Sequence, residues 1–173
     1  MTIKVIAEIG INHKGQFHKA KEIINIASRA NAWGVKFQFR EYNEFYATKN
    51  EIGDEILDKE IKRVHLNFDI IEKLRKHASK LGLKTGISFF KVKDFIKNKK
   101  FIKNFDFLKV PSSEFYNIKL INEYKKIGKK IFISTGGNEG KKILKFINSL
   151  KVNNFVIFHC ISNYPTLTGF QQL

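Results

Sequence analysis

Six short apolar runs alternate along the chain with stretches whose apolar residues recur at helical spacing, and this alternation constrains the fold more than any other feature. The predicted strands cover residues 3–9, 34–39, 83–89, 105–110, 129–134 and 154–160. The predicted helices cover 18–32, 68–82, 91–98, 118–128 and 139–150, and residues 40–64 are polar and irregular. Because strict β-α-β order implies a parallel sheet, the choice lies between a (β/α)8 barrel and an open doubly wound sheet.

The polar residues within the strands favour the barrel. Residues two apart share a face of a strand, so Lys36 and Gln38 lie on one face and Val35, Phe37 and Phe39 on the other. An apolar face that meets helices, opposite a face that turns polar near its carboxyl end, is typical of a (β/α)8 barrel. We therefore predict an α/β fold, an incomplete (β/α)8 TIM barrel with strands one to six in parallel order.

Each predicted strand also ends at or beside a polar or ionisable group. Taken singly, these groups have ordinary explanations, because lysines snorkel, serines start turns and a histidine can be a hydrogen-bonded core residue. Their shared position at the end where barrel enzymes carry their active sites predicts one common site. The groups are Glu8, Ser88, Lys109 with Ser112 and Ser113, Ser134 with Thr135, and His159.

The residue types suit an anionic ligand such as a phosphate. Two lysines, several hydroxyls and the turn STGGNEG (134–140) supply cations and donors, and the backbone N–H groups near Gly136 and Gly137 precede a helix. Glu8 and Glu114 are candidate acid–base groups. His13, in the loop after the first strand, fits a structural or a functional role equally. The sequence has no GxxxxGK[ST], GxGxxG, CxxC or HExxH pattern, and His159 with one carboxylate offers too few ligands for a metal site.

Composition narrows the class of protein. The formal net charge of +16 attracts anions, but the lysines are scattered without an arginine-rich arm, so small phosphates or acids are favoured over nucleic acid. No apolar run approaches the roughly 20 residues of a membrane helix, the N-terminus does not resemble a signal peptide, and there is one cysteine. We therefore expect a cytoplasmic protein that is not membrane-bound.

Five motifs, in order along nearly the whole chain, resemble the sialic acid synthases. These enzymes condense phosphoenolpyruvate with an N-acylated amino sugar to make nonulosonic acids. The motifs are IAEIGINHKG (Ile6–Gly15), GVKFQ (Gly34–Gln38), LKVPSSE (Leu108–Glu114), ISTGG (Ile133–Gly137) and HCISNYPT (His159–Thr166).

The resemblance implies roles for the strand-end residues. Glu114 would handle protons around the tetrahedral intermediate, and Glu8, Gln38 and Tyr164 would face the sugar. The remaining residues would bind phosphoenolpyruvate, mainly through its phosphate: Lys36, Ser88, Lys109, Ser112, Ser134 and Ser162. The resemblance also implies a transferase that forms homodimers at full length and uses a divalent metal, usually manganese, whose main ligands lie beyond Leu173.

Some features depart from the family. Phe89 and Phe90 replace a small or hydroxyl-bearing residue and its neighbour, Ser113 replaces a glycine, and Leu167 replaces a proline. Residues 40–64 match poorly. Strands seven and eight and the C-terminal antifreeze-like domain are absent from residues 1–173, so we expect the N-terminal portion of the synthase domain, inactive by itself.

Two alternatives remain open. One is a non-catalytic remnant or a basic binding module. The other is a phosphoenolpyruvate-dependent synthase of 3-deoxy sugar acids, against which the first and last motifs argue. The sequence leaves the amino sugar undetermined.

Overall fold

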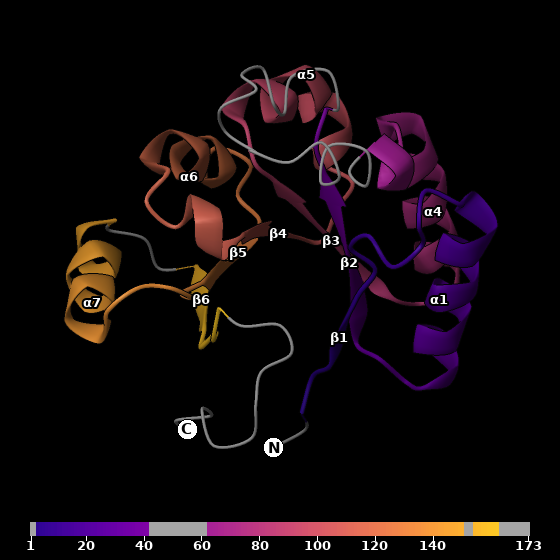
Figure 1. The fold of residues 1–173 in the computed structure, drawn as a ribbon, viewed down its shortest axis with the longest axis horizontal. Coiled ribbons are helices and arrows are strands. Elements are labelled where there is room, and N and C mark those ends of the chain that lie inside the picture. The colour runs from indigo at the N-terminus through magenta and orange to yellow at the C-terminus, as the bar shows by residue number, and fades with distance from the viewer. Residues whose placement is uncertain (1–2, 42–61, 151–153, 163–173) are drawn as a thin grey trace. The chain divides into compact units, whose positions relative to one another are not determined.

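The computed structural model describes residues 3–41, 62–150 and 154–162, which form two compact units, Met1–Asp106 and Phe107–Leu173 (Figure 1). The first unit contains β1 (Ile6–Glu8), α1 (Phe17–Arg29), β2 (Gly34–Phe39), α4 (Phe68–Lys80), β3 (Lys84–Phe89) and α5 (Val92–Ile102). The second contains β4 (Phe107–Val110), a 3-10 helix (Ser112–Glu114), α6 (Ile118–Lys125), β5 (Lys130–Ser134), α7 (Gly140–Ser149) and β6 (Phe155–Phe158).

In the first unit, β2 pairs with both β1 and β3, and both pairs are parallel. The register sets Glu8 opposite Lys36 and Gln38 opposite Ser88. Because the strands are parallel, their carboxyl ends lie at the same edge, and the polar residues of three different chain segments meet there.

The core of the first unit forms on the apolar face of β2, as its alternation predicts. Val35, Phe37 and Phe39 are buried. The Phe39 ring meets Phe68 of α4 and Phe89 of β3 edge to face, at centroid distances of 5.2 and 5.8 Å. Aromatic pairs in this geometry stabilise a core beyond simple burial, so they fix how α4 packs against the sheet.

In the second unit, β5 pairs in parallel with β4 and β6. Phe107 and Phe132 contact each other edge to face at 4.9 Å, and Phe132 also contacts Phe158. Helix α7 packs through Phe146, whose ring lies 4.9 and 5.0 Å from those of Phe115 and Tyr116.

The predicted first residues of α4 and α6 are confirmed, whereas the helices end at Lys80 and Lys125, before the predicted residues 82 and 128. The side chains of Asn67 and Asn117 cap α4 and α6 by accepting hydrogen bonds from the N–H groups of Ile70 and Leu120. Gly128 adopts φ +75° after α6, a conformation that suits glycine. The predicted end of α5 was wrong: the helix runs to Ile102, which is fully buried, rather than ending at residue 98.

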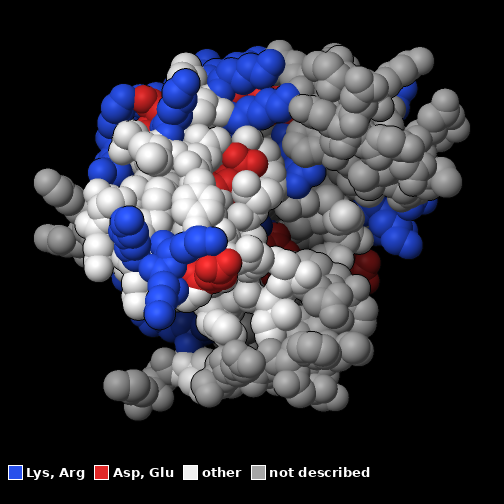
Figure 2. Space-filling model, turned by 60° about the vertical axis from the view of Figure 1, so that its left-hand side comes forward, with Lys and Arg blue, Asp and Glu red and all other residues white. Residues whose placement is uncertain are grey.

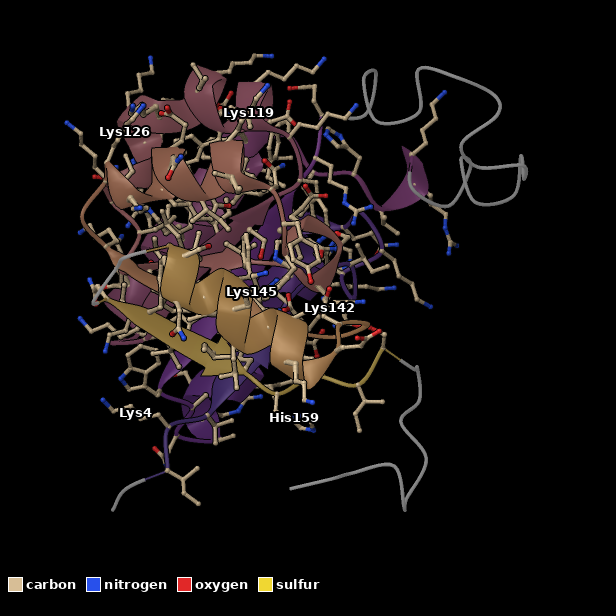
Figure 3. The ribbon with its side chains drawn as sticks, turned by 90° about the vertical axis from the view of Figure 1, so that its left-hand side faces the viewer. Lys4, Lys119, Lys126, Lys142, Lys145 and His159 are labelled. Atoms are coloured by element: carbon tan, nitrogen blue, oxygen red, sulfur yellow. The ribbon has the colours of Figure 1, made fainter. Side chains whose placement is uncertain are left out.

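On the face of the molecule shown in Figure 2, the described basic side chains are spread out with acidic ones among them. In the second unit, Lys119 lies on α6 and Lys145 lies on α7 (Figure 3). Lys126 pairs with Glu123, and Lys142 with Glu139, one helical turn apart. Within the described ranges, no helix has the length and apolar character needed to span a bilayer.

Candidate functional site

The carboxyl edge of the first unit carries a group that we call the lysine cluster: Glu8, Lys36 and Ser88. The ammonium Nζ of Lys36 lies 2.8 Å from Glu8 Oε2 and 3.1 Å from Ser88 Oγ. Lys36 is only 4% exposed, whereas the Glu8 side chain is 48% exposed. A buried cation is therefore held between a carboxylate open to solvent and a buried hydroxyl.

The loop after β1 shapes this cluster. Gly10 has φ +47°, and a Cβ added to it would lie 3.2 Å from Glu8 Oε1, so a side chain there would press on the carboxylate. The Asn12 side chain donates a hydrogen bond to the Glu8 carbonyl oxygen, and the N–H of Ile9 donates to the Lys36 carbonyl oxygen. The glycine and asparagine of the motif thus hold Glu8 at the end of the strand.

His13 closes the same loop. It is 5% exposed, and its Nδ1 accepts a hydrogen bond of 3.0 Å from the N–H of Gly15. Burial lowers the pKa of His13 below its ordinary value, outweighing a hydrogen bond with the Gly10 backbone that would raise it. Because Nδ1 can accept only when unprotonated, the loop requires a neutral imidazole. The structure therefore favours a structural role for His13.

Two further residues of the first unit were singled out from the sequence. Gln38 is half-buried, on the same face of β2 as Lys36. Phe89, which replaces a family hydroxyl, is fully buried, and its ring also contacts Phe95 at 5.6 Å. Phe89 is thus a core residue. The Arg40 guanidinium lies 3.5 Å from the centre of the Phe90 ring.

In the second unit, two hydroxyls converge on one glycine, a group that we call the serine cluster: Ser112, Ser162 and Gly136. The N–H of Gly136 donates a hydrogen bond of 3.1 Å to Ser112 Oγ. A Cβ added to Gly136 would lie 2.5 Å from Ser162 Oγ and 2.9 Å from Ser112 Oγ. The two serines follow β4 and β6, so the structure brings two hydroxyls from the loops after different strands to the same glycine.

Ser134 ends β5 and leads into the same glycine turn. It is 2% exposed, and its Oγ has no hydrogen-bond partner among the described residues. By contrast, the Thr135 hydroxyl donates to the Phe158 carbonyl oxygen at 2.9 Å. A buried hydroxyl without a partner is costly, and such groups are uncommon in native proteins.

Glu114 lies in the 3-10 helix after β4. Its Oε2 accepts a hydrogen bond of 2.8 Å from Asn117 Nδ2, and its Oε1 lies 3.5 Å from Ser113 Oγ. Lys109, on β4, is half-buried, and its carbonyl oxygen lies 3.5 Å from the Tyr124 hydroxyl. The carboxylate is thus anchored by its own loop and half-buried.

The remaining predictions have different outcomes. His159 is exposed rather than part of the core. Tyr164 lies outside the described residues. The structure joins Lys36 to Ser88 in one unit and Ser112 to Ser162 in the other. That both groups bind one phosphate stays a prediction. Among the described residues, no three His, Cys, Asp or Glu side chains gather as a metal site would require.

Sequence reasoning missed how three residues organise these groups. Gly10 and Gly136 matter through the side chains that crowd them, and Asn117 matters through its hydrogen bond to Glu114. The sequence shows that Gly136 precedes a second glycine and that Asn117 follows Glu114 by three residues. The contacts of these residues form only in the folded chain.

The fold and site define an α/β protein of repeated parallel β-α units with its polar groups at the carboxyl ends of the strands. The model of the NeuB family matches residues 23–173, and the chain belongs to that family.

Two curated relatives indicate the range of the similarity. The N,N'-diacetyllegionaminic acid synthase of Campylobacter jejuni is 30% identical over 93% of the chain and 52% of that protein. The N-acetylneuraminate-9-phosphate synthase of Drosophila melanogaster is 25% identical over 95% of the chain and 47% of that protein. The chain thus spans about half the length of the curated relatives it matches.

A solved structure supports the fold. The N-acetylneuraminic acid (sialic acid) synthetase of Leptospira borgpetersenii, crystallised with citrate, superposes with a TM-score of 0.81 at 23% identity. The match covers 97% of the chain and 57% of that structure. The predicted fold class, α/β with the first six parallel strands of a (β/α)8 barrel, is confirmed.

Proposed function

We propose that the protein carrying this chain condenses phosphoenolpyruvate with an N-acylated amino sugar to form a nonulosonic acid. Membership of the NeuB family and relatives that make legionaminic and neuraminic acids support the reaction class. The observation that carries the proposal is the buried ammonium of Lys36, from the middle of β2, in contact with Glu8 and Ser88 at the carboxyl ends of β1 and β3.

Lys36 supplies the charge that an anionic substrate needs. Taking an ammonium out of water costs several kcal/mol, and the half-exposed Glu8 carboxylate offsets part of this cost. A phosphate or carboxylate at this edge would add a further negative charge beside the ammonium. Phosphoenolpyruvate offers both groups, so we assign Lys36 and Ser88 to its binding.

The second unit would contribute hydroxyl donors. Ser134 has a buried Oγ without a partner in the described chain, and the Ser112 and Ser162 hydroxyls lie side by side at Gly136. Hydroxyls can donate to phosphate oxygens while their own lone pairs accept backbone N–H bonds, as Ser112 does from Gly136. With Lys109, these residues would hold the phosphate.

The two carboxylates would have different roles, Glu8 in binding the sugar and Glu114 in proton transfer. Glu8, 48% exposed, would face the sugar together with Gln38 and Tyr164. Carbon 3 of the enolpyruvate attacks the sugar aldehyde, and the aldehyde oxygen takes up a proton. Water adds to carbon 2 and loses a proton, for which Glu114 is the proposed acceptor. Phosphate leaves with cleavage of its bond to carbon 2.

The manganese that the family resemblance implies finds no fitting ligand set among the described residues. Activity that requires manganese would place its ligands in other residues of the protein.

The test measures phosphate release and product mass with phosphoenolpyruvate, manganese and a panel of sugars. The panel contains N-acetylmannosamine, its 6-phosphate and di-acetamido hexoses, and it also identifies the sugar. Phosphoenolpyruvate labelled with ¹⁸O at the bridging position should deliver the label to phosphate. Condensation with an aldose phosphate that lacks an N-acyl group would instead favour the 3-deoxy sugar acid class. No turnover with any aldehyde by the folded, full-length protein would refute the proposal.

A further inference from the structure

The side-chain amide of Asn117 makes two hydrogen bonds in opposite directions. Its Oδ1 accepts from the N–H of Leu120 at 3.0 Å, which caps α6. Its Nδ2 donates to Glu114 Oε2 at 2.8 Å. One planar group thus joins the first turn of a helix to the carboxylate assigned to proton transfer.

The cap decides which side of the amide faces Glu114. A helix N-terminus offers only N–H donors, so the amide oxygen must turn toward α6. The amino group, on the other side of the same plane, then faces away from the helix and meets the carboxylate. The backbone supports this geometry, because the N–H of Asn117 donates to the Glu114 carbonyl oxygen at 2.9 Å.

The two carboxylate oxygens of Glu114 are therefore not equivalent. Oε2 has a short hydrogen bond to an amide that the helix holds in place. Among the described residues, the one polar contact of Oε1 is with Ser113 Oγ at 3.5 Å, which is too long to be strong. This leaves Oε1 as the oxygen oriented to accept a proton.

Asn67 provides an internal comparison. It caps α4 in the same way, with its Oδ1 3.0 Å from the N–H of Ile70. In the part of the chain that the structure describes, no carboxylate is hydrogen-bonded to the Asn67 amide. Capping alone therefore does not require the second contact.

We propose that Asn117 is a positioning residue, which orients Glu114 so that its Oε1 faces the reacting atoms. This inference rests on the proposed function, in which Glu114 handles the proton. It adds a residue to the site that acts through Glu114 and does not touch the substrate itself.

The experiment separates capping from positioning in the full-length protein. Asn117→Asp and Asn117→Ser keep an oxygen that can cap α6 but lose the amide donor, and Asn117→Ala loses both. Using both replacements distinguishes the lost donor from the added charge of aspartate. Asn67→Asp is the matched control for a change of cap chemistry alone.

We expect the aspartate and serine variants to keep the melting temperature to within about 2 °C, and the alanine variant to lose roughly 2–4 °C. All three should lower kcat by on the order of tenfold to a hundredfold, with the KM for phosphoenolpyruvate within about twofold of wild type. The Asn67→Asp control should keep both kinetic constants. A kcat that falls only in the alanine variant, in step with its stability, would show that Asn117 is merely a cap and overturn the inference.

A second readout does not depend on turnover. In a ¹H–¹⁵N spectrum, the side-chain amide signal of Asn117, assigned by its loss in Asn117→Asp, should move when Glu114 is replaced by glutamine. If the signal moves but the wild type makes no nonulosonic acid, the proposed function fails while the contact stands. If the wild type is active and the signal does not move, the positioning inference fails alone.

Discussion

Glu8→Gln and Lys36→Met test whether the buried ammonium of the lysine cluster serves stability or ligand binding. The first substitution removes the charge of the carboxylate and keeps its shape. The second removes the ammonium and keeps an unbranched apolar stem of similar length. In Glu8→Gln the residue that loses a charged partner is the buried Lys36, whereas in Lys36→Met it is the half-exposed Glu8.

The magnitude follows from the 2.8 Å separation of Lys36 Nζ and Glu8 Oε2. Coulomb attraction at that distance is about 1.5 kcal/mol in bulk water and about 6 kcal/mol at an effective dielectric constant of 20. Since water reaches nearly half of Glu8, the lower part of this range applies, and we expect Glu8→Gln to destabilise the fold by about 2–3 kcal/mol. In Lys36→Met, Glu8 turns to solvent and the buried Ser88 hydroxyl loses its hydrogen bond to Lys36, a cost of about 1 kcal/mol.

Urea unfolding and phosphoenolpyruvate binding are measured on both variants and the wild type. With a slope of about 2 kcal/mol per molar urea, Glu8→Gln should lower the midpoint by roughly 1 M and Lys36→Met by half of that or less. Binding should show the reverse order. Lys36→Met should raise the KM for phosphoenolpyruvate tenfold or more, because it removes a buried charge-assisted contact. Glu8→Gln should reduce turnover more than it weakens phosphoenolpyruvate binding.

The reasoning is refuted if Lys36→Met destabilises the protein more than Glu8→Gln does while phosphoenolpyruvate binding is unchanged. That combination would make Lys36 a structural residue. Unchanged turnover in Glu8→Gln would remove Glu8 from the site.

Three further predictions address the other groups. Gly136→Ala places a Cβ against Ser162 Oγ and Ser112 Oγ, so we expect at least a tenfold rise in the KM for phosphoenolpyruvate; an unchanged constant would separate these hydroxyls from the phosphate. Ser134→Ala should change the free energy of unfolding by less than about 1 kcal/mol yet raise the same KM. A large loss of stability would contradict a hydroxyl that has no partner among the described residues. Burial lowers the pKa of His13, so the contribution of the neutral imidazole to stability is complete above the unfolded pKa of about 6.5 and is lost as the pH falls through the folded pKa. His13→Gln should therefore weaken the decrease in the free energy of unfolding between about pH 7.5 and 5. An unaltered pH dependence would contradict a neutral imidazole that accepts a hydrogen bond.

The fold could be predicted from the sequence where one short-range rule decides the structure. The alternation of Lys36 and Gln38 with three apolar residues fixes both faces of β2, and the structure gives that strand the predicted bounds. The caps at Asn67 and Asn117 are equally local, because oxygen and N–H donor lie three residues apart. β1 was less predictable: only residues 6–8 of the predicted 3–9 pair with β2, since pairing depends on the neighbouring strand.

The site could be predicted as a set of residues but not as a set of contacts. Glu8, Lys36 and Ser88 are recognisable as strand ends, yet the ion pair at Lys36 depends on a register that joins segments far apart in the chain. The sequence predicted only that the backbone N–H groups near Gly136 could act as hydrogen-bond donors. Its closeness to Ser112 and Ser162 requires three loops to be in place. These contacts are tertiary, and no spacing in the sequence encodes them.

The strand ends carry costs that a chain selected for stability alone would avoid. An apolar residue would fit the buried position of Lys36, and alanine would leave no unpaired hydroxyl at Ser134. The Lys36 ammonium contacts Glu8 and Ser88 at the carboxyl ends of β1 and β3, and Ser134 ends β5, where this class of fold carries its chemistry. An anion bound beside either residue would add a negative partner for the ammonium or an acceptor for the hydroxyl. Stability and the family resemblance thus lead to the same residues, and the Lys36→Met and Ser134→Ala variants test this directly.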